Sequence, residues 1–253
     1  AVEMHAQAGA LGEWMADPGA MGRALERAGL WPWSVHCPDA AYNMAAEDEA
    51  ARLAAVRAGA TSFPAARDLG ASVVVCHVNA PGKPFWPQDY EASLARSRRS
   101  LEALAGEAAR AGVRMAVETM IPRPHKRPGQ RVAELLRLIE GLGDHVGICI
   151  DTGHSHAGGA GLADEVAAAG AKLFTVHIND NHGRADDDEH LLPGEGTIDW
   201  PGALGALDAG GFVQPRIIEV NRVSGDDDGR RTVARLGEIV RAWQSLPVLP
   251  SER

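Results

Sequence analysis

The sequence predicts an α/β protein built as a (β/α)8 barrel. The clearest observation is a β-α-β unit, in which an apolar run over 71–78 is followed by a loop, by helical spacing over 90–111 and by a second apolar run over 113–119. A crossover of this length makes the two strands parallel. The runs are continuously apolar, which is typical of a parallel sheet that is covered on both faces.

The same alternation recurs along the chain. Strands are predicted near residues 1–5, 32–37, 72–79, 114–119, 146–151, 173–179 and 215–220. Helices are predicted near 13–28, 46–67, 89–111, 131–140, 161–169, 200–209 and 229–245. A chain of 253 residues fits one such barrel, so we expect a single domain over 1–253. The longest predicted loop, 181–200, is of a length that is typical of functional loops.

The number of predicted strands is one short of a closed eight-stranded barrel. The chain begins inside the first predicted strand, over 1–5. Three explanations are open: the barrel lacks its first strand and helix, it is incomplete, or one strand escapes prediction.

Composition excludes several classes of protein. Hydrophobic residues make up 45% and charged residues 23%, which are ordinary globular values. No apolar run approaches the roughly 20 residues that span a bilayer, and the N-terminus has no secretory signal pattern, so we expect a cytoplasmic protein without membrane contact. A net charge of −9 argues against long nucleic acids as partners.

Cysteine spacing gives no sign of a disulfide framework or a thiolate zinc site. The three cysteines are far apart and form no C-x-x-C pair: Cys37, Cys76 and Cys149. We expect them to be buried, inert thiols.

Six consecutive predicted strands end in a histidine or a carboxylate. Functional residues of parallel barrels lie at these strand ends, and here they are His36, His77, Glu118, Asp151 with His154 close behind it, His177 and Glu219. One such histidine is more often structural, but a carboxylate in an apolar strand is costly to bury unless a metal or cation balances it. Imidazoles and carboxylates without thiolates suit Mn²⁺, Mg²⁺, Co²⁺ or Zn²⁺.

The long loop adds two further candidates, Asp188 and His190. The glycines and proline that follow, over 193–196, can turn this segment back over the barrel mouth. Asp186 and Asp187 belong to the same acidic run, and we interpret them as solvated residues.

Taken together, these motifs resemble the xylose-isomerase-like TIM barrels. The resemblance covers most of the chain and rests on Val117-Glu-Thr119, Ile150-Asp-Thr-Gly-His154, Val176-His-Ile-Asn-Asp-Asn181, Asp188-Glu-His190 with Pro193-Gly-Glu-Gly196, and Ile218-Glu219. The superfamily holds sugar-phosphate isomerases, ketose epimerases, inosose and hydroxypyruvate isomerases, and DNA-repair enzymes of the endonuclease IV type. The motif series is specific for the superfamily and not for a substrate.

The resemblance implies a metal-dependent isomerase or epimerase that acts on a small polyhydroxylated carbonyl substrate, a sugar or sugar phosphate. In such enzymes one divalent metal is held by four residues, here Glu118, Asp151, His177 and Glu219. The two glutamates would also be the acid–base pair, one taking a carbon-bound proton and the other returning it through an enediolate. His154 would bind a substrate hydroxyl or a second metal.

Two further residues are candidates for substrate binding. The resemblance suggests that Trp86 stacks on the sugar ring, although a surface aromatic in a proline-rich loop is an equal alternative. Lys126 belongs to the basic stretch 123–127 that follows Glu118, which is either a solvated loop or a site for a phosphate or carboxylate. The glycines over 158–161 follow Asp151 too loosely for a phosphate-binding turn, so no nucleotide cofactor is expected. A homo-oligomer is left open.

An endonuclease IV-like phosphodiesterase is the alternative. Its three-zinc cluster uses nine ligands, and motif by motif these correspond to His36, His77, Glu118, Asp151, His154, His177, Asp188, His190 and Glu219. The net charge of −9 and the absence of Arg- and Lys-rich loops with wedge-like aromatics argue against DNA as the substrate. We therefore favour the isomerase or epimerase. A non-catalytic metal or sugar binder has no support, because both glutamates are present.

Overall fold

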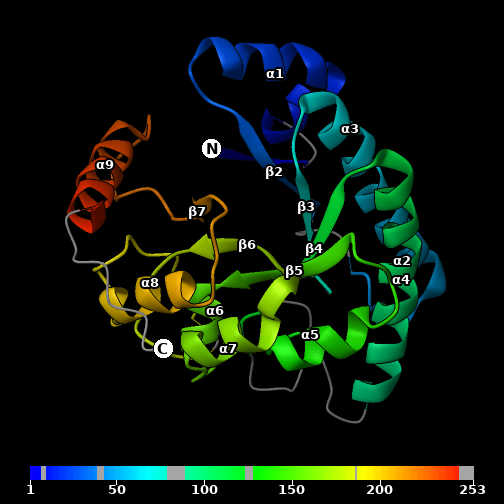
Figure 1. Ribbon diagram of the computed structural model, residues 1–253. Coiled ribbons are helices and arrows are strands. Elements are labelled where there is room, and N and C mark those ends of the chain that lie inside the picture. Colours follow the sequence, from blue (N-terminus) through cyan, green and yellow to red (C-terminus); the bar gives the residue numbers. More distant parts are fainter. Residues whose placement is uncertain (7–9, 39–42, 79–88, 123–127, 186, 245–253) are drawn as a thin grey trace.

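The computed structural model describes residues 1–6, 10–38, 43–78, 89–122, 128–185 and 187–244. Seven parallel strands follow chain order in one sheet, which curls into a nearly closed barrel with β1 and β7 as its edges (Figure 1). The strands are β1 Val2–His5, β2 Pro32–His36, β3 Val73–Cys76, β4 Arg114–Glu118, β5 Val146–Asp151, β6 Leu173–Ile178 and β7 Arg216–Ile218. All seven predicted strands are confirmed, and within the described residues the barrel has one strand fewer than a (β/α)8 barrel.

Helices surround this sheet (Figure 1). They are α1 Pro18–Arg27, α2 Glu49–Ala60, α3 Ser62–Leu69, α4 Tyr90–Ala111, α5 Val132–Ile139, α6 Thr152–Ala157, α7 Leu162–Ala169, α8 Trp200–Ala209 and α9 Arg230–Gln244, with the 3₁₀ helices η1 Ala10–Ala16 and η3 Gly170–Lys172. None of these described helices is long and apolar enough to cross a membrane.

One predicted helix, over 46–67, is wrong as a single element. The chain forms α2 and α3 instead, separated at Thr61. The reason is Pro64, which has no N–H to donate to the carbonyl of Ala60 and whose ring would clash with that carbonyl in a continuous helix.

Two other helix boundaries also differ from prediction. The helix predicted over 13–28 is η1 followed by α1, because the Asp17 side chain accepts a hydrogen bond from the backbone of Ala20 (2.8 Å) and Pro18 follows in the first turn. The short α6 was not predicted. It begins directly after β5, where the Asp151 side chain accepts from the backbone N–H of His154 (2.7 Å).

The alternation of side chains along each strand positions the ionisable residues. An apolar layer fills the interior of the barrel, formed by Trp33, Val73, Val75, Ala116, Cys149, Phe174 and Ile217. On four strands the ionisable residue comes two positions after a member of this layer, and so points to the same side: His77 after Val75, Glu118 after Ala116, Asp151 after Cys149 and Glu219 after Ile217. The outward-facing residues pack against the helices in the main core.

All three cysteines are buried. Cys37 and Cys76 lie with their sulfur atoms 3.2 Å apart between β2 and β3. The prediction that the three cysteines are buried is confirmed.

Candidate metal centre

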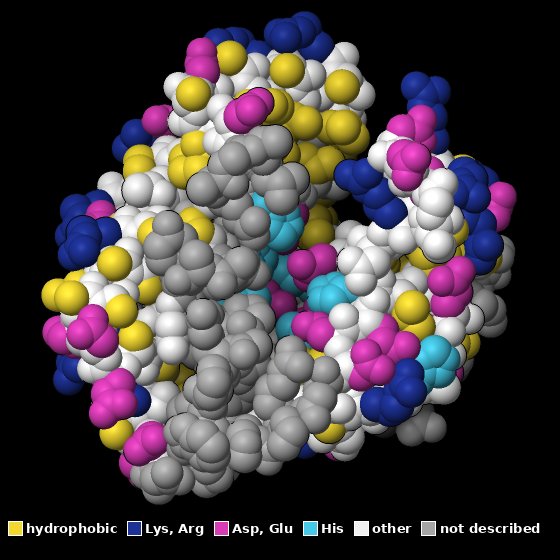
Figure 2. Space-filling model, turned by 180° about the vertical axis from the view of Figure 1, so that it is seen from behind, with side chains coloured by type: hydrophobic (Ala, Val, Ile, Leu, Met, Phe, Trp, Pro, Cys, Tyr) yellow, Lys and Arg dark blue, Asp and Glu magenta, His cyan; other side chains and the backbone are white. Residues whose placement is uncertain are grey.

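The nine strand-end and loop residues predicted as ligands lie together at the carboxyl end of the barrel. Figure 2 shows histidine and acidic side chains gathered in a hollow in the middle of this face. Their ligand atoms form three groups, in each of which the atoms lie within 4.8 Å of one another. We call these the outer donor group (His36, His77, Glu118), the central donor group (Glu118, Asp151, His177, Glu219) and the loop donor group (His154, Asp188, His190).

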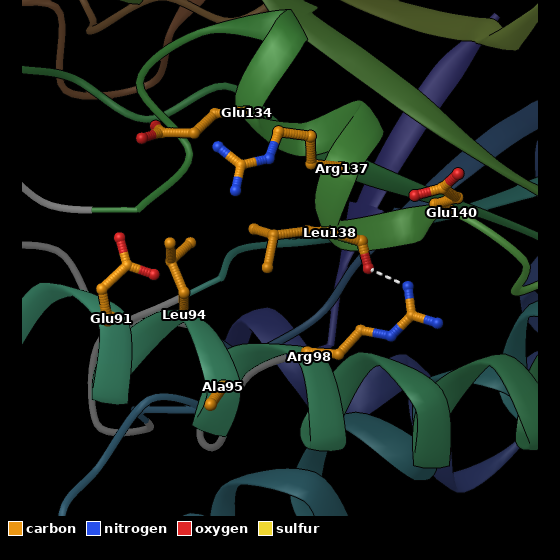
Figure 3. Close-up of a pocket in the computed structure, with 8 residues that line it drawn as sticks. All are labelled: Glu91, Leu94, Ala95, Arg98, Glu134, Arg137, Leu138 and Glu140. Atoms are coloured by element: carbon orange, nitrogen blue, oxygen red, sulfur yellow. Dashed lines mark hydrogen bonds between the residues drawn. The ribbon is translucent and has the colours of Figure 1, made fainter.

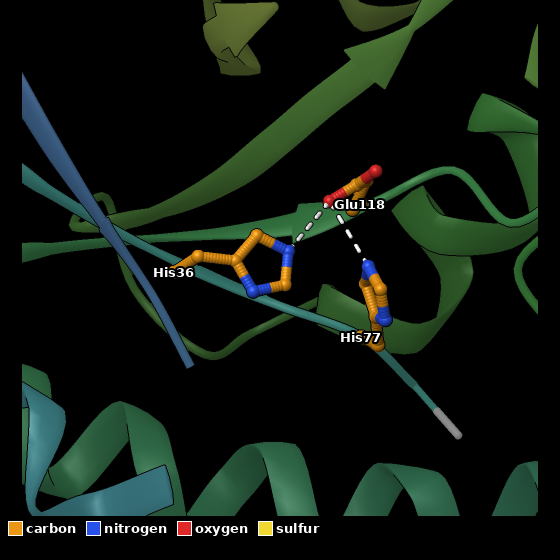
Figure 4. A group of neighbouring side chains, drawn as sticks. All are labelled: His36, His77 and Glu118. Carbon is orange, nitrogen blue, oxygen red and sulfur yellow. Dashed lines mark hydrogen bonds and ion pairs between the residues drawn. The ribbon is translucent and has the colours of Figure 1, made fainter. Parts of the chain in front are cut away.

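The outer donor group is centred on one carboxylate oxygen (Figure 4). Oε2 of Glu118 lies 3.3 Å from Nε2 of His36 and 3.2 Å from Nε2 of His77. The other ring nitrogen of His36 donates to the carbonyl of Cys37 (2.8 Å), which fixes the ring orientation. Burial by itself lowers the pKa of His36, but the hydrogen bond to Glu118 and the charge of Glu3 raise it to about 10.

The central donor group surrounds Nδ1 of His177. This nitrogen lies 2.9 Å from Oε2 of Glu219 and 3.3 Å from Oε1 of Glu118. Burial opposes ionisation of both glutamates, but the charge of His177 lowers the pKa of each below its usual range. Both side chains are therefore carboxylates at neutral pH.

Asp151 completes the central donor group and is held by its neighbours. Its Oδ1 accepts from the backbone of His154 (2.7 Å), and its Oδ2 accepts from Nδ2 of Asn179 (2.6 Å). Burial raises the pKa of Asp151, and the charge of His154, which lowers it, offsets only part of this rise. A cation beside this buried carboxylate would favour its ionised form.

The loop donor group is brought together by the chain after β6. Oδ1 of Asp188 lies 3.3 Å from Nε2 of His154 and 3.1 Å from Nε2 of His190. The second ring nitrogen of each histidine faces a backbone carbonyl, Thr119 at 2.6 Å and Glu219 at 3.0 Å respectively. This placement of Asp188 and His190 beside His154 confirms the prediction that the loop returns over the barrel mouth.

Charge pairing within the loop donor group is strong. Burial by itself lowers the pKa of both histidines, but Asp151 and Asp188 raise the pKa of His154 to about 9, and the hydrogen bond to Asp188 raises that of His190 to about 10. His190 also has a positive φ of 45°, which is uncommon for a residue with a side chain.

The chemistry of the central donor group fits a divalent metal ion. Nδ1 of His177 is buried and makes no hydrogen bond, although two carboxylates face it. A buried polar atom in this situation needs a partner, and a cation among these oxygen and nitrogen atoms would provide one. Imidazole and carboxylate together suit Zn²⁺, Mn²⁺ or Co²⁺.

Three features near the site were not assigned by sequence reasoning. Asn179 lies within one of the quoted motifs, but no sequence pattern indicated that it holds Asp151. Glu3 in β1 reaches His177, and nothing about a single glutamate in a short strand indicated this. Cys149 lies with Glu118 and His177 in a fourth group of potential donors, but burial raises the pKa of its thiol and so disfavours the thiolate that binds metal.

The two predicted substrate-binding residues, Trp86 and Lys126, lie outside the described residues. A separate groove lies on the outside of the barrel between α4 and α5 and contains none of the predicted site residues (Figure 3). It is lined partly by Glu91, Arg98 and Arg137, and Arg98 donates to the carbonyl of Leu138 across it (2.6 Å).

A family model described as xylose isomerase-like TIM barrel matches residues 1–241. The chain belongs to this family. Among the proteins that it resembles, an uncharacterized protein of Sinorhizobium fredii is 31% identical over 148 residues, which are 58% of this chain and 46% of that protein. The chain thus spans less than half the length of this relative. A probable endonuclease 4 of Mycobacterium tuberculosis is 28% identical over 204 residues, which are 78% of this chain and 77% of the relative.

Solved structures share the xylose isomerase-like fold with this chain. A D-tagatose 3-epimerase-like protein superimposes with a TM-score of 0.76 at 23% identity, covering 96% of this chain and 90% of its own. The IOLI protein with a bound zinc atom gives a TM-score of 0.75 at 20% identity, covering 96% and 90%. An L-ribulose 3-epimerase gives 0.71 at 21% identity, covering 94% and 84%.

Proposed function

We propose that this chain is a divalent-metal-dependent sugar isomerase or epimerase that works by proton transfer. The observation that carries the proposal is the central donor group, in which Glu118 and Glu219 approach the same nitrogen of His177 from two strands at 3.3 and 2.9 Å. Structural neighbours named as a D-tagatose 3-epimerase-like protein and an L-ribulose 3-epimerase support the same class of reaction.

Four residues would hold the ion: Glu118, Asp151, His177 and Glu219. When bound, a divalent ion supplies polarisation of a substrate carbonyl, which makes an adjacent carbon-bound proton easier to remove. The protein supplies the bases. Glu118 and Glu219 have lowered pKa values, so both are ionised and able to accept a proton.

The side chains of the two glutamates differ in their exposure to solvent. The Glu118 side chain is 2% exposed and is fixed by two histidines, whereas that of Glu219 is 25% exposed at the end of β7. Removal of a proton by one glutamate and its return by the other, to the adjacent carbon or to the opposite face, gives isomerisation or epimerisation through an enediolate. A sugar or sugar phosphate with a carbonyl beside a hydroxyl is the substrate class.

Solvent deuterium incorporation tests this proposal. Protein loaded with Mn²⁺ is incubated in D₂O with a panel of ketoses, inososes and their phosphates, and each sugar is analysed by mass spectrometry and NMR. We expect deuterium at the carbon next to the carbonyl of at least one sugar, together with an isomer or epimer. Absence of exchange over the whole panel, with the metal bound, would contradict the proposal.

A multinuclear phosphodiesterase is the second candidate, and one observation favours it. The outer and loop donor groups offer four histidines, Asp188 and the shared Glu118 around the central donor group, and a probable endonuclease 4 is among the relatives. Metal-activated water at such a centre hydrolyses phosphodiesters.

Metal content separates the two candidates. It is measured by mass spectrometry on protein purified without added metal or chelator. About one ion per chain supports the isomerase or epimerase. Two or three zinc ions per chain would favour the phosphodiesterase, and cleavage of phosphodiesters and of abasic sites would then be the activity to measure.

A further inference from the structure

Glu3 reaches from β1 across the barrel interior to His177 on β6. Its Oε2 accepts a hydrogen bond from Oγ of Ser34 (2.6 Å) and lies 3.2 Å from Nε2 of His177. Glu3 and Ser34 are partners in the register of β1 and β2, so their side chains lie on the same face of the sheet. The carboxylate is therefore fixed by a neighbouring strand before it meets the histidine.

The two nitrogens of His177 face different groups. Nδ1 faces Glu118 and Glu219, and Nε2 faces Glu3. A histidine binds metal through a nitrogen that carries no proton, and the partner of the other nitrogen decides which nitrogen that is. Because a carboxylate only accepts hydrogen bonds, Glu3 requires the proton on Nε2 and leaves the Nδ1 lone pair free to face the central donor group.

The contact between Glu3 and His177 is shielded from solvent. The side chain of Glu3 is 5% exposed and that of His177 is fully buried. A carboxylate that accepts from Nε2–H increases the electron density of the imidazole, which strengthens the imidazole as a ligand.

We propose that Glu3 is a positioning residue, which holds His177 in its Nε2–H form and thereby sets the affinity of the central donor group for a divalent ion. The inference rests on the metal-dependent function proposed above. It assigns a role in the site to a strand that contributes no residue to the three donor groups.

Histidine NMR during a Zn²⁺ titration tests this role at the residue itself. Protein stripped of metal is titrated with Zn²⁺ alone, buffered to known free concentrations, and the ¹⁵N signals of the His177 ring are followed. In the parent protein we expect Nδ1 to respond to Zn²⁺ while the proton stays on Nε2. In Glu3→Gln the midpoint should move to free Zn²⁺ about 10–100-fold higher. Glu3→Ala, which also loses the acceptor, should move it further.

Two other variants control the experiment. Glu165 is a buried glutamate on α7, outside the barrel, whose carboxylate accepts from the backbone of Val132 (2.6 Å), and Glu165→Gln should keep the parental midpoint. Ser34→Ala removes the 2.6 Å hydrogen bond to Glu3 without touching the histidine, and it should raise the midpoint by a smaller factor. If the Glu3 variants do not fold, Ser34→Ala alone tests the role of Glu3.

The outcomes separate the two proposals. A parental protein whose His177 responds to Zn²⁺, combined with unchanged midpoints in folded Glu3→Gln or Ser34→Ala, overturns the role of Glu3 and leaves the proposed metal site standing. A parental protein whose His177 does not respond to Zn²⁺ overturns both.

Discussion

Nδ1 of His177 lies 2.9 Å from Oε2 of Glu219, and this buried nitrogen makes no hydrogen bond. The approach follows from strand register. β6 and β7 pair with His177 opposite Ile217, and the backbone N–H of Glu219 extends the ladder by donating to the carbonyl of Ile178 (3.0 Å). The backbone thus brings an imidazole and a carboxylate together without satisfying the nitrogen, which is the arrangement that a bound cation completes.

Glutamine at either glutamate should abolish proton exchange. Glu118→Gln and Glu219→Gln keep the shape of the side chain but remove the base, so we expect solvent deuterium incorporation to fall by about 10²–10⁴-fold at saturating Mn²⁺. Metal content is measured in parallel, because each variant also loses a charged ligand. Glu165→Gln, which changes a buried carboxylate on α7 outside the donor groups, is the control. Parental turnover in either site variant would exclude the acid–base pair.

Asp180 should control the loop that carries Asp188 and His190. The side chain of Asp180 is fully buried and accepts four hydrogen bonds at 2.8–3.1 Å. The donors are the backbone N–H groups of Asn181, Gly194 and Ile198 and the indole N–H of Trp200.

In Asp180→Asn an NH₂ group replaces one of the two accepting oxygens. The donors that face this position then have no acceptor. Each buried donor left without an acceptor costs about 1–3 kcal/mol, so the free energy of unfolding in urea should fall by at least that amount. Amide hydrogen exchange should increase over 181–199 and remain parental in β3 and β4. Parental exchange in the loop would show that other contacts hold it.

The sequence was sufficient to predict the strands and the convergence of the strand-end residues, because both depend on local patterns. The assignment of nine metal ligands rests on the family resemblance and stays a prediction. A strand is a short apolar run, and parallel strands end at the same rim, so ionisable residues at those ends had to converge. Pro64, which explains the break at Thr61, is visible in the sequence as well, but the helix predicted over 46–67 took no account of it.

Glu3 and Asn179 could not be found in this way. Glu3 acts on His177, 174 positions away, and this contact depends on how the sheet curls rather than on any neighbouring residue. Asn179 holds Asp151 because β5 and β6 pair with Asp151 opposite His177. Such relationships belong to the register and curvature of the sheet, which a single sequence does not reveal.

Gly153 should be required for the geometry of Asp151. A Cβ at this position would lie 2.0 Å from Oδ1 of Asn179, the residue whose amide donates to Asp151 at 2.6 Å. Gly153→Ala should therefore displace Asn179, lower the free energy of unfolding by about 1–3 kcal/mol and weaken metal binding by the central donor group. Denaturation and metal titration measure the two effects.

Gly106→Ala is the matched control for this prediction. Gly106 lies within α4, where a Cβ would meet only the end of the Arg110 side chain at 3.6 Å. Alanine is favoured over glycine in a helix by about 1 kcal/mol, so this variant should be slightly more stable and bind metal normally. Equal metal affinity in both variants would refute the role assigned to Gly153.

We expect acid to undock α9 from the rest of the protein by protonating Asp226. This carboxylate accepts from the hydroxyl (2.6 Å) and the backbone N–H (2.7 Å) of Thr232 in the first turn of α9, and the hydroxyl hydrogen bond lowers the pKa of Asp226 below its usual 3.8. Because the unfolded chain takes up this proton at a higher pH than the folded chain does, the interaction stabilises the fold above about pH 4. The contribution is lost as the pH falls through the lowered pKa.

The fluorescence of Trp243 measures this release, because its ring lies 5.2 Å from that of Trp200 when α9 is docked. We expect a change in emission between pH 4 and pH 2 that is reversible on neutralisation, and the same change already at pH 6 in Asp226→Asn. Asp228→Asn is the control, since Asp228 is exposed and contacts the backbone N–H (3.1 Å) and the guanidinium (3.0 Å) of Arg230 rather than Thr232. If Asp226→Asn follows the parental pH profile, another group in the protein controls the docking of α9.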